Sequence, residues 1–200
     1  MEFRGMRRND KSLTFEECEE LLKEGKYDCL SVNGDGGYPY GVFLNYGYVD
    51  GKIFFHSTAD IENSHKLSSI QNDDKVCFTV ETRHELAPAE LNTYFRSVCV
   101  FGRARILMDP DERWEAMQKW MTGLAPEFLE WAKMDCQKDS PTLAMVEIVP
   151  EHVTGKYMAG DPDPAEHARV AAMMAKMSGK EMPEGHPDIA TMMAKMKHMD

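Results

Sequence analysis

Two short polar segments hold the side chains of this sequence best suited to binding an anion. Phe55 to Thr58 ends an apolar run with an imidazole and two hydroxyl groups, and Ser64-His65-Lys66 follows soon after it. Hydroxyl groups, the free N–H groups of a helix start and a lysine together favour a phosphate dianion. The alternative is a helix capped by Ser64, with Lys66 in solvent. Residue types alone favour that alternative, because serine is common at helix starts.

Two further segments offer contacts for a planar ligand. Pro39 to Tyr46 combines aromatic and amide side chains with the small Gly41, so a flat ring could lie against the backbone. In Arg96 to Arg103, strand alternation places polar ends where a ligand could bind at the mouth of a barrel. Both segments also fit ordinary strands, with the arginines solvated. The residues of the second segment expected on one face are Arg96, Val98, Val100 and Gly102.

Short strands joined by tight turns surround these segments and predict a mainly β (α+β) protein. Thr14 and Glu17 have the spacing of a capping box, Asn63 or Ser64 can cap a short helix, and Asp50-Gly51 fits a hairpin turn. Asp109-Pro110 opens another helix, which carries an apolar stripe, and a further helix is expected around 128–134. The predicted strands are residues 27–32, 38–49, 52–57, 75–82, 98–107 and 143–149.

Six such strands with few helices between them predict an antiparallel barrel, closed or partly closed, because closure removes exposed edges. The first three strands are joined by short turns, so we expect them to be consecutive neighbours in a meander.

Composition changes near residue 158 and predicts two parts. Residues 158–200 contain no aromatic residue but 9 of the 16 methionines, whereas residues 1–157 contain every Phe, Trp and Tyr. We therefore expect a β domain over 1–157 and a helical C-terminal extension over 158–200.

The extension repeats a methionine-rich heptapeptide at 171–177 and 190–196. Helical spacing aligns the methionines of each copy, which favours two amphipathic helices packed on the barrel or across a dimer. Two other interpretations are a partner-binding surface of adaptable methionines and a soft-metal site with His186 and His198 nearby. Stripes of this kind usually pack, so the first interpretation is favoured, and no metal site is predicted.

Charge and cysteine content exclude several classes of protein. The formal net charge of −11 disfavours contact with nucleic acid, and no apolar run approaches the ~20 residues that a membrane span needs. The five cysteines are odd in number, and no two have C-x-x-C spacing, so buried free thiols in a reducing cytoplasm are expected.

Taken in order, these segments resemble the FMN-binding split barrels of the pyridoxamine 5'-phosphate oxidase superfamily, in the nitroimidazole-resistance-protein branch. The resemblance covers residues 6 to about 157, and the order of the motifs carries it more than any single motif. Residues 58–63 are longer than the corresponding family segment and lack its glycine before His65. The segments that match are 6–8, 37–40, 44–46, 50–57, 65–67, 75–78, 97–104 and 153–156.

The resemblance implies a six-stranded antiparallel split β-barrel with flanking helices that binds FMN as a homodimer. Lys66, then His65 and Ser57, are implied to hold the phosphate and ribityl chain, and His56 is implied to face the substrate or the flavin edge. This makes His56 the one candidate for a catalytic role. The other implied FMN-binding residues are Tyr40, Val42, Leu44, Asn45, Tyr46, Thr58, Arg96 and Ser97, the last two often supplied by the second subunit.

Two classes of function follow from the resemblance. The first is an FMN-dependent oxidoreductase that passes electrons from NADH or NADPH to a small electron-poor acceptor, such as a nitro compound. The second is a flavin- or haem-binding carrier or sensor without turnover of its own. A small-molecule-binding barrel that has lost its cofactor is a third, weaker class.

Overall fold

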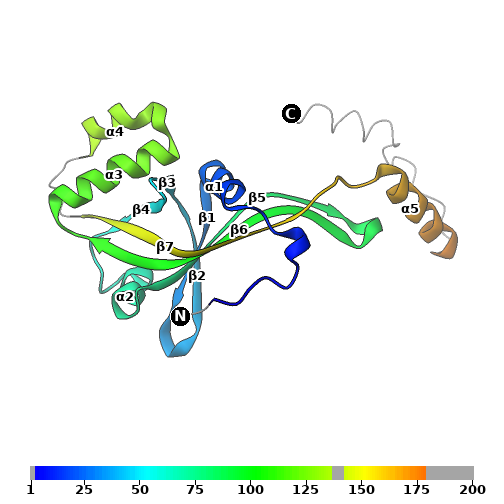
Figure 1. The fold of residues 1–200 in the computed structure, drawn as a ribbon, viewed down its shortest axis with the longest axis horizontal. Coiled ribbons are helices and arrows are strands. Elements are labelled where there is room, and N and C mark those ends of the chain that lie inside the picture. The colour runs from blue at the N-terminus through cyan, green and yellow to red at the C-terminus, as the bar shows by residue number, and fades with distance from the viewer. Residues whose placement is uncertain (1–2, 137–141, 179–200) are drawn as a thin grey trace. The chain divides into compact units, whose positions relative to one another are not determined.

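The computed structural model of the chain describes residues 3–136 and 142–178 (Figure 1). They divide into two compact units. The first unit combines residues up to 82 with residues 96–157, and the second combines residues 83–95 with those from 158 onward. The composition shift at residue 158 gives no sign that residues 83–95 group with the C-terminal part.

One antiparallel sheet of seven strands organises the fold, in the order β2-β1-β5-β6-β7-β4-β3. The predicted class of a mainly β split barrel is confirmed. The strands are β1 (Tyr27–Asn33), β2 (Pro39–Asn45), β3 (Gly47–Val49), β4 (Lys52–Thr58), β5 (Lys75–Ala87), β6 (Asn92–Leu107) and β7 (Leu143–Met158). The helices are α1 (Phe15–Glu24), α2 (His65–Asn72), α3 (Pro110–Leu124), α4 (Leu129–Asp135) and α5 (Pro164–Ser178), with short 3-10 turns η1 (Asn9–Lys11), η2 (Asp35–Gly37), η3 (Pro88–Glu90) and η4 (Pro126–Phe128).

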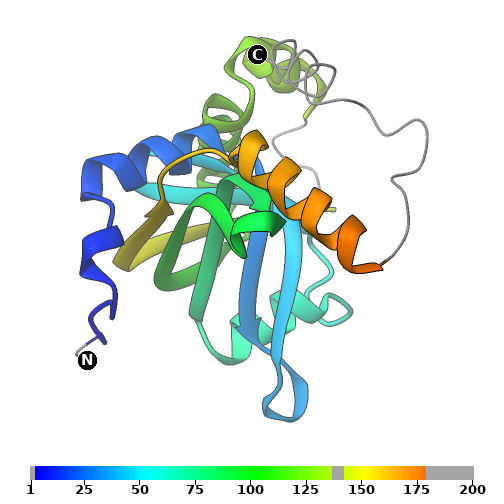
Figure 2. The ribbon, with the colours of Figure 1, turned by 90° about the vertical axis from the view of Figure 1, so that its right-hand side faces the viewer.

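The predicted strand over residues 38–49 is in fact two strands, β2 and β3, separated by Tyr46 alone. β2 pairs with β1, whereas β3 pairs with β4 at the other end of the sheet. Both predicted pairs of antiparallel neighbours are confirmed, but the two hairpins lie at opposite ends of the strand order and do not form one continuous meander. Since one residue joins those ends, the sheet must curl into a barrel, although no ladder closes it (Figure 2).

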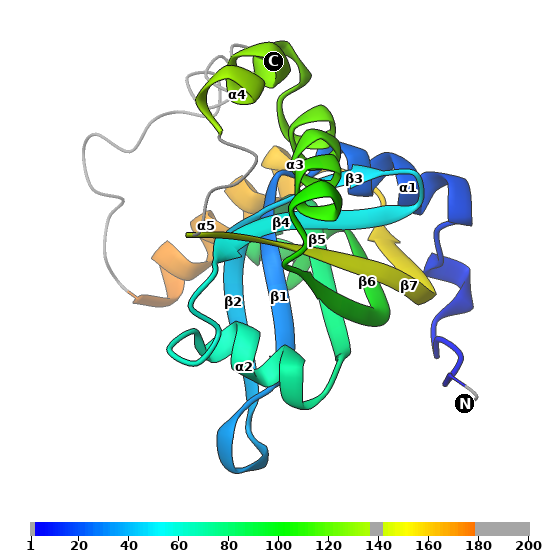
Figure 3. The same cartoon turned by 90° about the vertical axis from the view of Figure 1, so that its left-hand side faces the viewer.

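The barrel encloses the main hydrophobic core, and α1 and α2 cover it at opposite ends (Figures 1 and 3). Leu21 and Leu22 of α1 and Leu67 and Ile70 of α2 are almost completely buried in this core. Apolar side chains spaced three and four residues apart give each helix the buried face that fixes it there.

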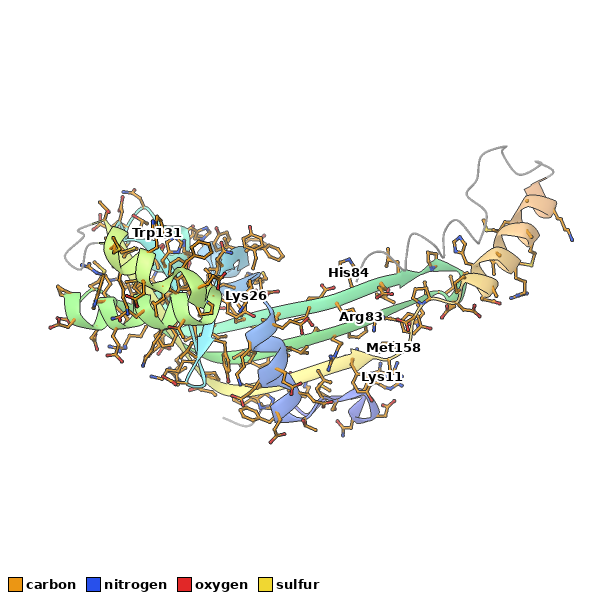
Figure 4. All side chains as sticks on the ribbon, turned by 90° about the horizontal axis from the view of Figure 1, so that it is seen from above. Lys11, Lys26, Arg83, His84, Trp131 and Met158 are labelled. Atoms are coloured by element: carbon orange, nitrogen blue, oxygen red, sulfur yellow. The ribbon has the colours of Figure 1, made fainter. Side chains whose placement is uncertain are left out.

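A second core lies between the sheet and α3, which crosses β3 and β4 (Figure 3). The helix approaches β3 at backbone contact: a Cβ on Gly47 would lie 2.4 Å from the carbonyl oxygen of Trp120, and one on Gly123 would lie 2.7 Å from the Cα of Gly47. Lys26 donates to the carbonyl oxygen of Gly123 over 2.6 Å, so the segment between α1 and β1 also contacts the end of α3 (Figure 4).

Local sequence signals predicted several boundaries correctly. Thr14 and Glu17 form the expected capping box of α1. Asp50 and Gly51 turn between β3 and β4 with φ of 52° and 73°, values that a two-residue hairpin turn of this kind requires. Asp109 accepts hydrogen bonds from the N–H groups of Asp111 and Glu112 at the start of α3.

The second unit is held together by polar contacts. Arg83 pairs with Asp161 and donates to the carbonyl oxygen of Gly160 over 3.1 Å, and Glu90 accepts from the N–H of Asp163 over 2.7 Å. Glu90 also accepts a hydrogen bond from the Tyr94 hydroxyl.

The first copy of the methionine repeat lies on α5, where Met173 and Met174 are 49% and 63% exposed. Packing of these methionines on the barrel or across a dimer stays a prediction. The second copy, with His186 and His198, lies outside the described residues. Among the residues described, no helix has the length and apolar character needed to cross a membrane.

Candidate functional site

The start of α2 is a helix terminus without a side-chain cap. Ser64 occupies the cap position, but its side chain makes no hydrogen bond to the first turn, so the interpretation of Ser64 as a cap is wrong. The preceding loop closes on itself, because Asp60 donates its N–H to Thr58 and accepts from Asn63. The first N–H groups of α2 therefore remain available, and the helix dipole favours a negative charge there.

Lys66 lies in the first turn of α2 and is half-buried. Burial lowers the pKa of its amine, and no carboxylate among the described residues raises it again. An ammonium group removed from water costs free energy unless an anion or hydrogen-bond acceptor compensates. Lys66 therefore has unused capacity to bind an anion.

His56 on β4 lies near Lys66 and against α3. Its imidazole contacts the ring of Trp120, with centroids 4.6 Å apart. Although the side chain keeps an exposed surface, burial by its neighbours and then the positive charge of Lys66 lower the pKa of His56 below its ordinary value of 6.5. The imidazole is therefore neutral at pH 7, with one nitrogen a donor and the other an acceptor.

His65 is held by the β1–β2 hairpin. Its ring stacks on Tyr40 at a centroid distance of 4.1 Å, and its Nε2 lies 3.6 Å from a carboxylate oxygen of Asp35. The structure thus brings Tyr40 and His65 together, and these contacts restrict the orientation of His65 beside Lys66.

The predicted ligand-facing residues of β2 point to both sides of the strand. Tyr40, Val42 and Leu44 are half-buried against the main core, whereas Asn45 is exposed on the opposite side and donates to the carbonyl oxygen of Lys26 over 3.3 Å.

Tyr46 is completely buried, and its hydroxyl donates to the carbonyl oxygen of Leu22 over 3.0 Å. The side chain fills the barrel interior and offers no surface to a ligand, so we leave Tyr46 out of the candidate site.

The polar side chains at the end of β4 also point to both sides of their strand. Ser57 alternates in phase with the buried Phe55, and its buried hydroxyl oxygen has no hydrogen-bond partner in the part of the chain that the structure describes. His56 and Thr58 point the other way and are exposed. Ser57 therefore has a hydrogen-bonding group that the fold does not use.

Arg96 and Ser97 are half-buried at the point where β6 enters the first unit. The predicted alternation is confirmed beyond them, since Val98, Val100 and Gly102 are buried. No contact joins Arg96 or Ser97 to His56 or Lys66 among the described residues.

Trp120 is the neighbour of His56 that sequence reasoning missed as a site residue. Its position in the apolar stripe of α3 predicted packing alone. Its indole N–H is buried without a partner among the described residues, like the Ser57 hydroxyl. Of these two unpaired polar groups, the indole N–H belongs to the ring that contacts His56, whereas the Ser57 hydroxyl lies on the opposite side of β4.

The assembled site consists of Lys66, the start of α2, His56 and Trp120. It combines a cation and free N–H donors with a neutral imidazole and an indole, which suits an anion attached to an aromatic group. In the described ranges, no cluster of three or more His, Cys, Asp or Glu side chains could hold a metal ion.

Family comparison agrees with the architecture around this site. The sequence model of the pyridoxamine 5'-phosphate oxidase family matches residues 14–157. The chain belongs to this family. The match begins just before α1, covers the strands and helices α1 to α4 with residues 83–95 of the second unit, and ends just before Met158.

Solved structures of other proteins share this fold. The flavocytochrome Anf3 from Azotobacter vinelandii aligns with a TM-score of 0.65 at 18% identity, covering 82% of this chain and 78% of its own. A candidate 5-nitroimidazole antibiotic resistance protein from Bacteroides thetaiotaomicron aligns at 0.57 and 19% identity, covering 72% and 85%. The FAD- and haem-binding protein from Mycobacterium smegmatis aligns at 0.60 and 17% identity, covering 80% of each chain. No curated protein sequence matches the chain.

The proximity of Lys66 and His56 can be tested directly. We expect Lys66→Met to raise the pKa of His56, because the substitution removes the positive charge that opposes protonation of the imidazole. The measurement is an NMR titration of the His56 ring protons. Lys75→Met, at an exposed position on β5, is the matched control and should leave that pKa unchanged. An unaltered His56 pKa in Lys66→Met would contradict the site as described.

Proposed function

We propose that this protein binds FMN and acts as an oxidoreductase. Electrons pass from NADH or NADPH to a small electron-poor acceptor of the nitro-compound type. The observation that carries the proposal is the uncapped start of α2, with Lys66 half-buried and without a carboxylate partner beside His56. Membership of the pyridoxamine 5'-phosphate oxidase family supports it.

The residues present fit the phosphate end of FMN. A phosphate monoester carries between one and two negative charges at pH 7 and offers three acceptor oxygens. The N–H groups of the first α2 turn and the Lys66 amine are donors that this group requires. The unpaired hydroxyl of Ser57 provides a further hydrogen bond for the ribityl chain, and Thr58 and His65 adjoin the same segment.

The remaining proposed contacts involve the flavin ring. The proposed contacts along one side of the flavin ring come from β2: Tyr40, Val42, Leu44 and Asn45. Arg96 and Ser97 form the further edge of the proposed site, supplied by the second subunit of a homodimer.

Bound FMN would supply the hydride chemistry, and the protein residues would position it and control its charge. Lys66 neutralises the phosphate in a chain whose net charge is −11. Trp120 and His56 provide an aromatic surface and, through the neutral imidazole, one donor and one acceptor near the ring. The family chemistry needs no dedicated general acid, so His56 has an orienting role, with the capacity to take up a proton at its free nitrogen.

A second candidate function is a flavin- or haem-binding carrier or sensor without turnover. It is favoured by the similarity to Anf3, a flavocytochrome, and to the mycobacterial protein that binds FAD and haem. A barrel that binds another small molecule is the third candidate. We propose a reducing cytoplasm as the location of the protein, because its five cysteines are odd in number and no two have C-x-x-C spacing.

We further propose a homodimer that uses the outer face of β1 and β2. Tyr27 and Phe43 stack on this face with centroids 5.8 Å apart, and each is 60% exposed. Stacked aromatic residues exposed on a strand surface are typical of an interface core. The neighbouring Gly41 leaves space for close approach.

Lys66 tests the proposed FMN site. Purified protein should be yellow and show a flavin absorption band, and Lys66→Met should weaken FMN binding about tenfold to a hundredfold through loss of a charge-assisted hydrogen bond. Titration calorimetry with FMN measures this, with thermal unfolding to show that the fold is retained. Lys75→Met should bind FMN normally. Protein that binds no FMN would remove the basis of the proposal, and normal affinity in Lys66→Met would place the phosphate elsewhere.

Turnover separates the oxidoreductase from the carrier. With bound FMN, we expect NADH or NADPH to bleach the flavin band and a nitro compound or quinone to restore it repeatedly. Steady-state nicotinamide oxidation, followed by absorbance, measures this cycle. A flavin band that neither nicotinamide bleaches would contradict the oxidoreductase and favour the carrier.

The proposed dimer surface can be tested by substituting Phe43 and, as a matched control, a similarly exposed phenylalanine elsewhere in the chain. Phe43→Ser should shift the protein from dimer to monomer in light scattering, because it removes apolar area from the proposed interface. Phe128→Ser, in η4, alters an aromatic residue of similar exposure, 55%, and should leave the dimer intact. A Phe43→Ser protein that stays dimeric would exclude this face.

A further inference from the structure

Two cysteines far apart in sequence touch on the outer face of the sheet. Cys77 on β5 and Cys99 on β6 place their sulfur atoms 3.3 Å apart. β5 and β6 are adjacent strands. The two sulfur atoms would have to approach by about a further 1.3 Å to reach the ~2.05 Å length of a disulfide bond.

The surroundings prepare Cys77 for reaction. The contact with Cys99, in which either sulfur can donate, lowers the pKa of Cys77. Burial works in the opposite direction, and the hydroxyl of Thr79 at 3.8 Å lowers the pKa further. The same contact, together with burial, raises the pKa of Cys99. The pair thus combines a thiolate-forming nucleophile with a protonated partner, which is the arrangement of an attacking and a resolving cysteine.

The other cysteines make different contacts. Cys29 lies on the same outer face of the neighbouring β1, and its sulfur makes a hydrogen bond to the backbone carbonyl of Leu30 at 3.8 Å. Cys18 is buried in the main core, as predicted for the cysteines in general, whereas Cys29, Cys77 and Cys99 are only partly buried. No third ligand joins the pair among the described residues, so a metal site does not explain it.

We propose that Cys77 and Cys99 are a peroxide-reactive dithiol that forms a reversible disulfide within one chain. The Cys77 thiolate attacks an oxygen of hydrogen peroxide. The O–O bond breaks, a sulfenic acid forms, and the departing hydroxide takes up a proton to become water. The Cys99 sulfur then attacks the sulfenic sulfur, so the S–S bond forms, the S–O bond breaks, and the leaving oxygen departs as a second water with the Cys99 proton. One peroxide is reduced by two electrons, and two thiols are oxidised to one disulfide.

Thiol counting in the full-length protein tests this proposal. The protein is reduced, freed of reductant, treated with one equivalent of hydrogen peroxide and alkylated in denaturant, followed by intact and peptide mass spectrometry. We expect alkylated cysteines to fall from five to three, a peptide pair linked through Cys77 and Cys99, and recovery of all five after reduction. Five alkylated cysteines after peroxide, or a bridge to another cysteine or another chain, would overturn the proposal.

Three variants sharpen the result. Cys99→Ser should leave the Cys77 sulfenic acid trapped by dimedone, because no resolving thiol remains, and Cys77→Ser should give neither adduct nor bridge. Cys29→Ser is the matched control, since it removes a thiol from the same face, and its bridge should form at the wild-type rate. A bridge that forms equally fast without Cys77, or one that requires Cys29, would overturn the assignment.

Discussion

The barrel depends on the buried side chain of Tyr46, the single residue between β2 and β3. Its N–H donates to the carbonyl oxygen of Lys26, its hydroxyl donates to that of Leu22 over 3.0 Å, and its ring packs on Phe78 at 4.8 Å. β2 and β3 lie at the two ends of the sheet order, and no ladder joins them. The chain passes from one end of the sheet order to the other through Tyr46, and these contacts anchor that residue to α1, to the residue before β1 and to β5.

Signals confined to neighbouring residues predicted their part of the fold. The capping box of Thr14, the Asp50-Gly51 turn and the Asp109 cap depend on backbone geometry within three residues. The division of residues 38–49 was not predictable in this way, because strand-forming residues lie on both sides of Tyr46 and only distant partners distinguish β2 from β3. The full lengths of β5, β6 and β7 were missed for the same reason.

The candidate site shows the same limit. The pairing of His65 with Lys66 could be seen in the sequence, and the resemblance to a flavoprotein family assigned it a role. No short sequence pattern indicated that Trp120 contacts His56, because the spacing of apolar residues on α3 is that of any packed helix. Likewise, a separation of 22 residues along two strands concealed the contact of Cys77 with Cys99. Side chains on different elements meet through strand order and register, and one sequence does not encode these as a short pattern.

The contact of Gly47 with α3 has a mechanical consequence for the site. Because the backbones of β3 and α3 touch at Trp120, this side cannot open without separating main-chain atoms from one another. On the other side, Tyr40 and His65 meet only through their rings, and His65 is exposed. Rotation of those rings leaves the main chain in place. Main-chain packing therefore fixes the α3 side of the site, whereas exchangeable side-chain contacts bound the side between the β1–β2 hairpin and α2.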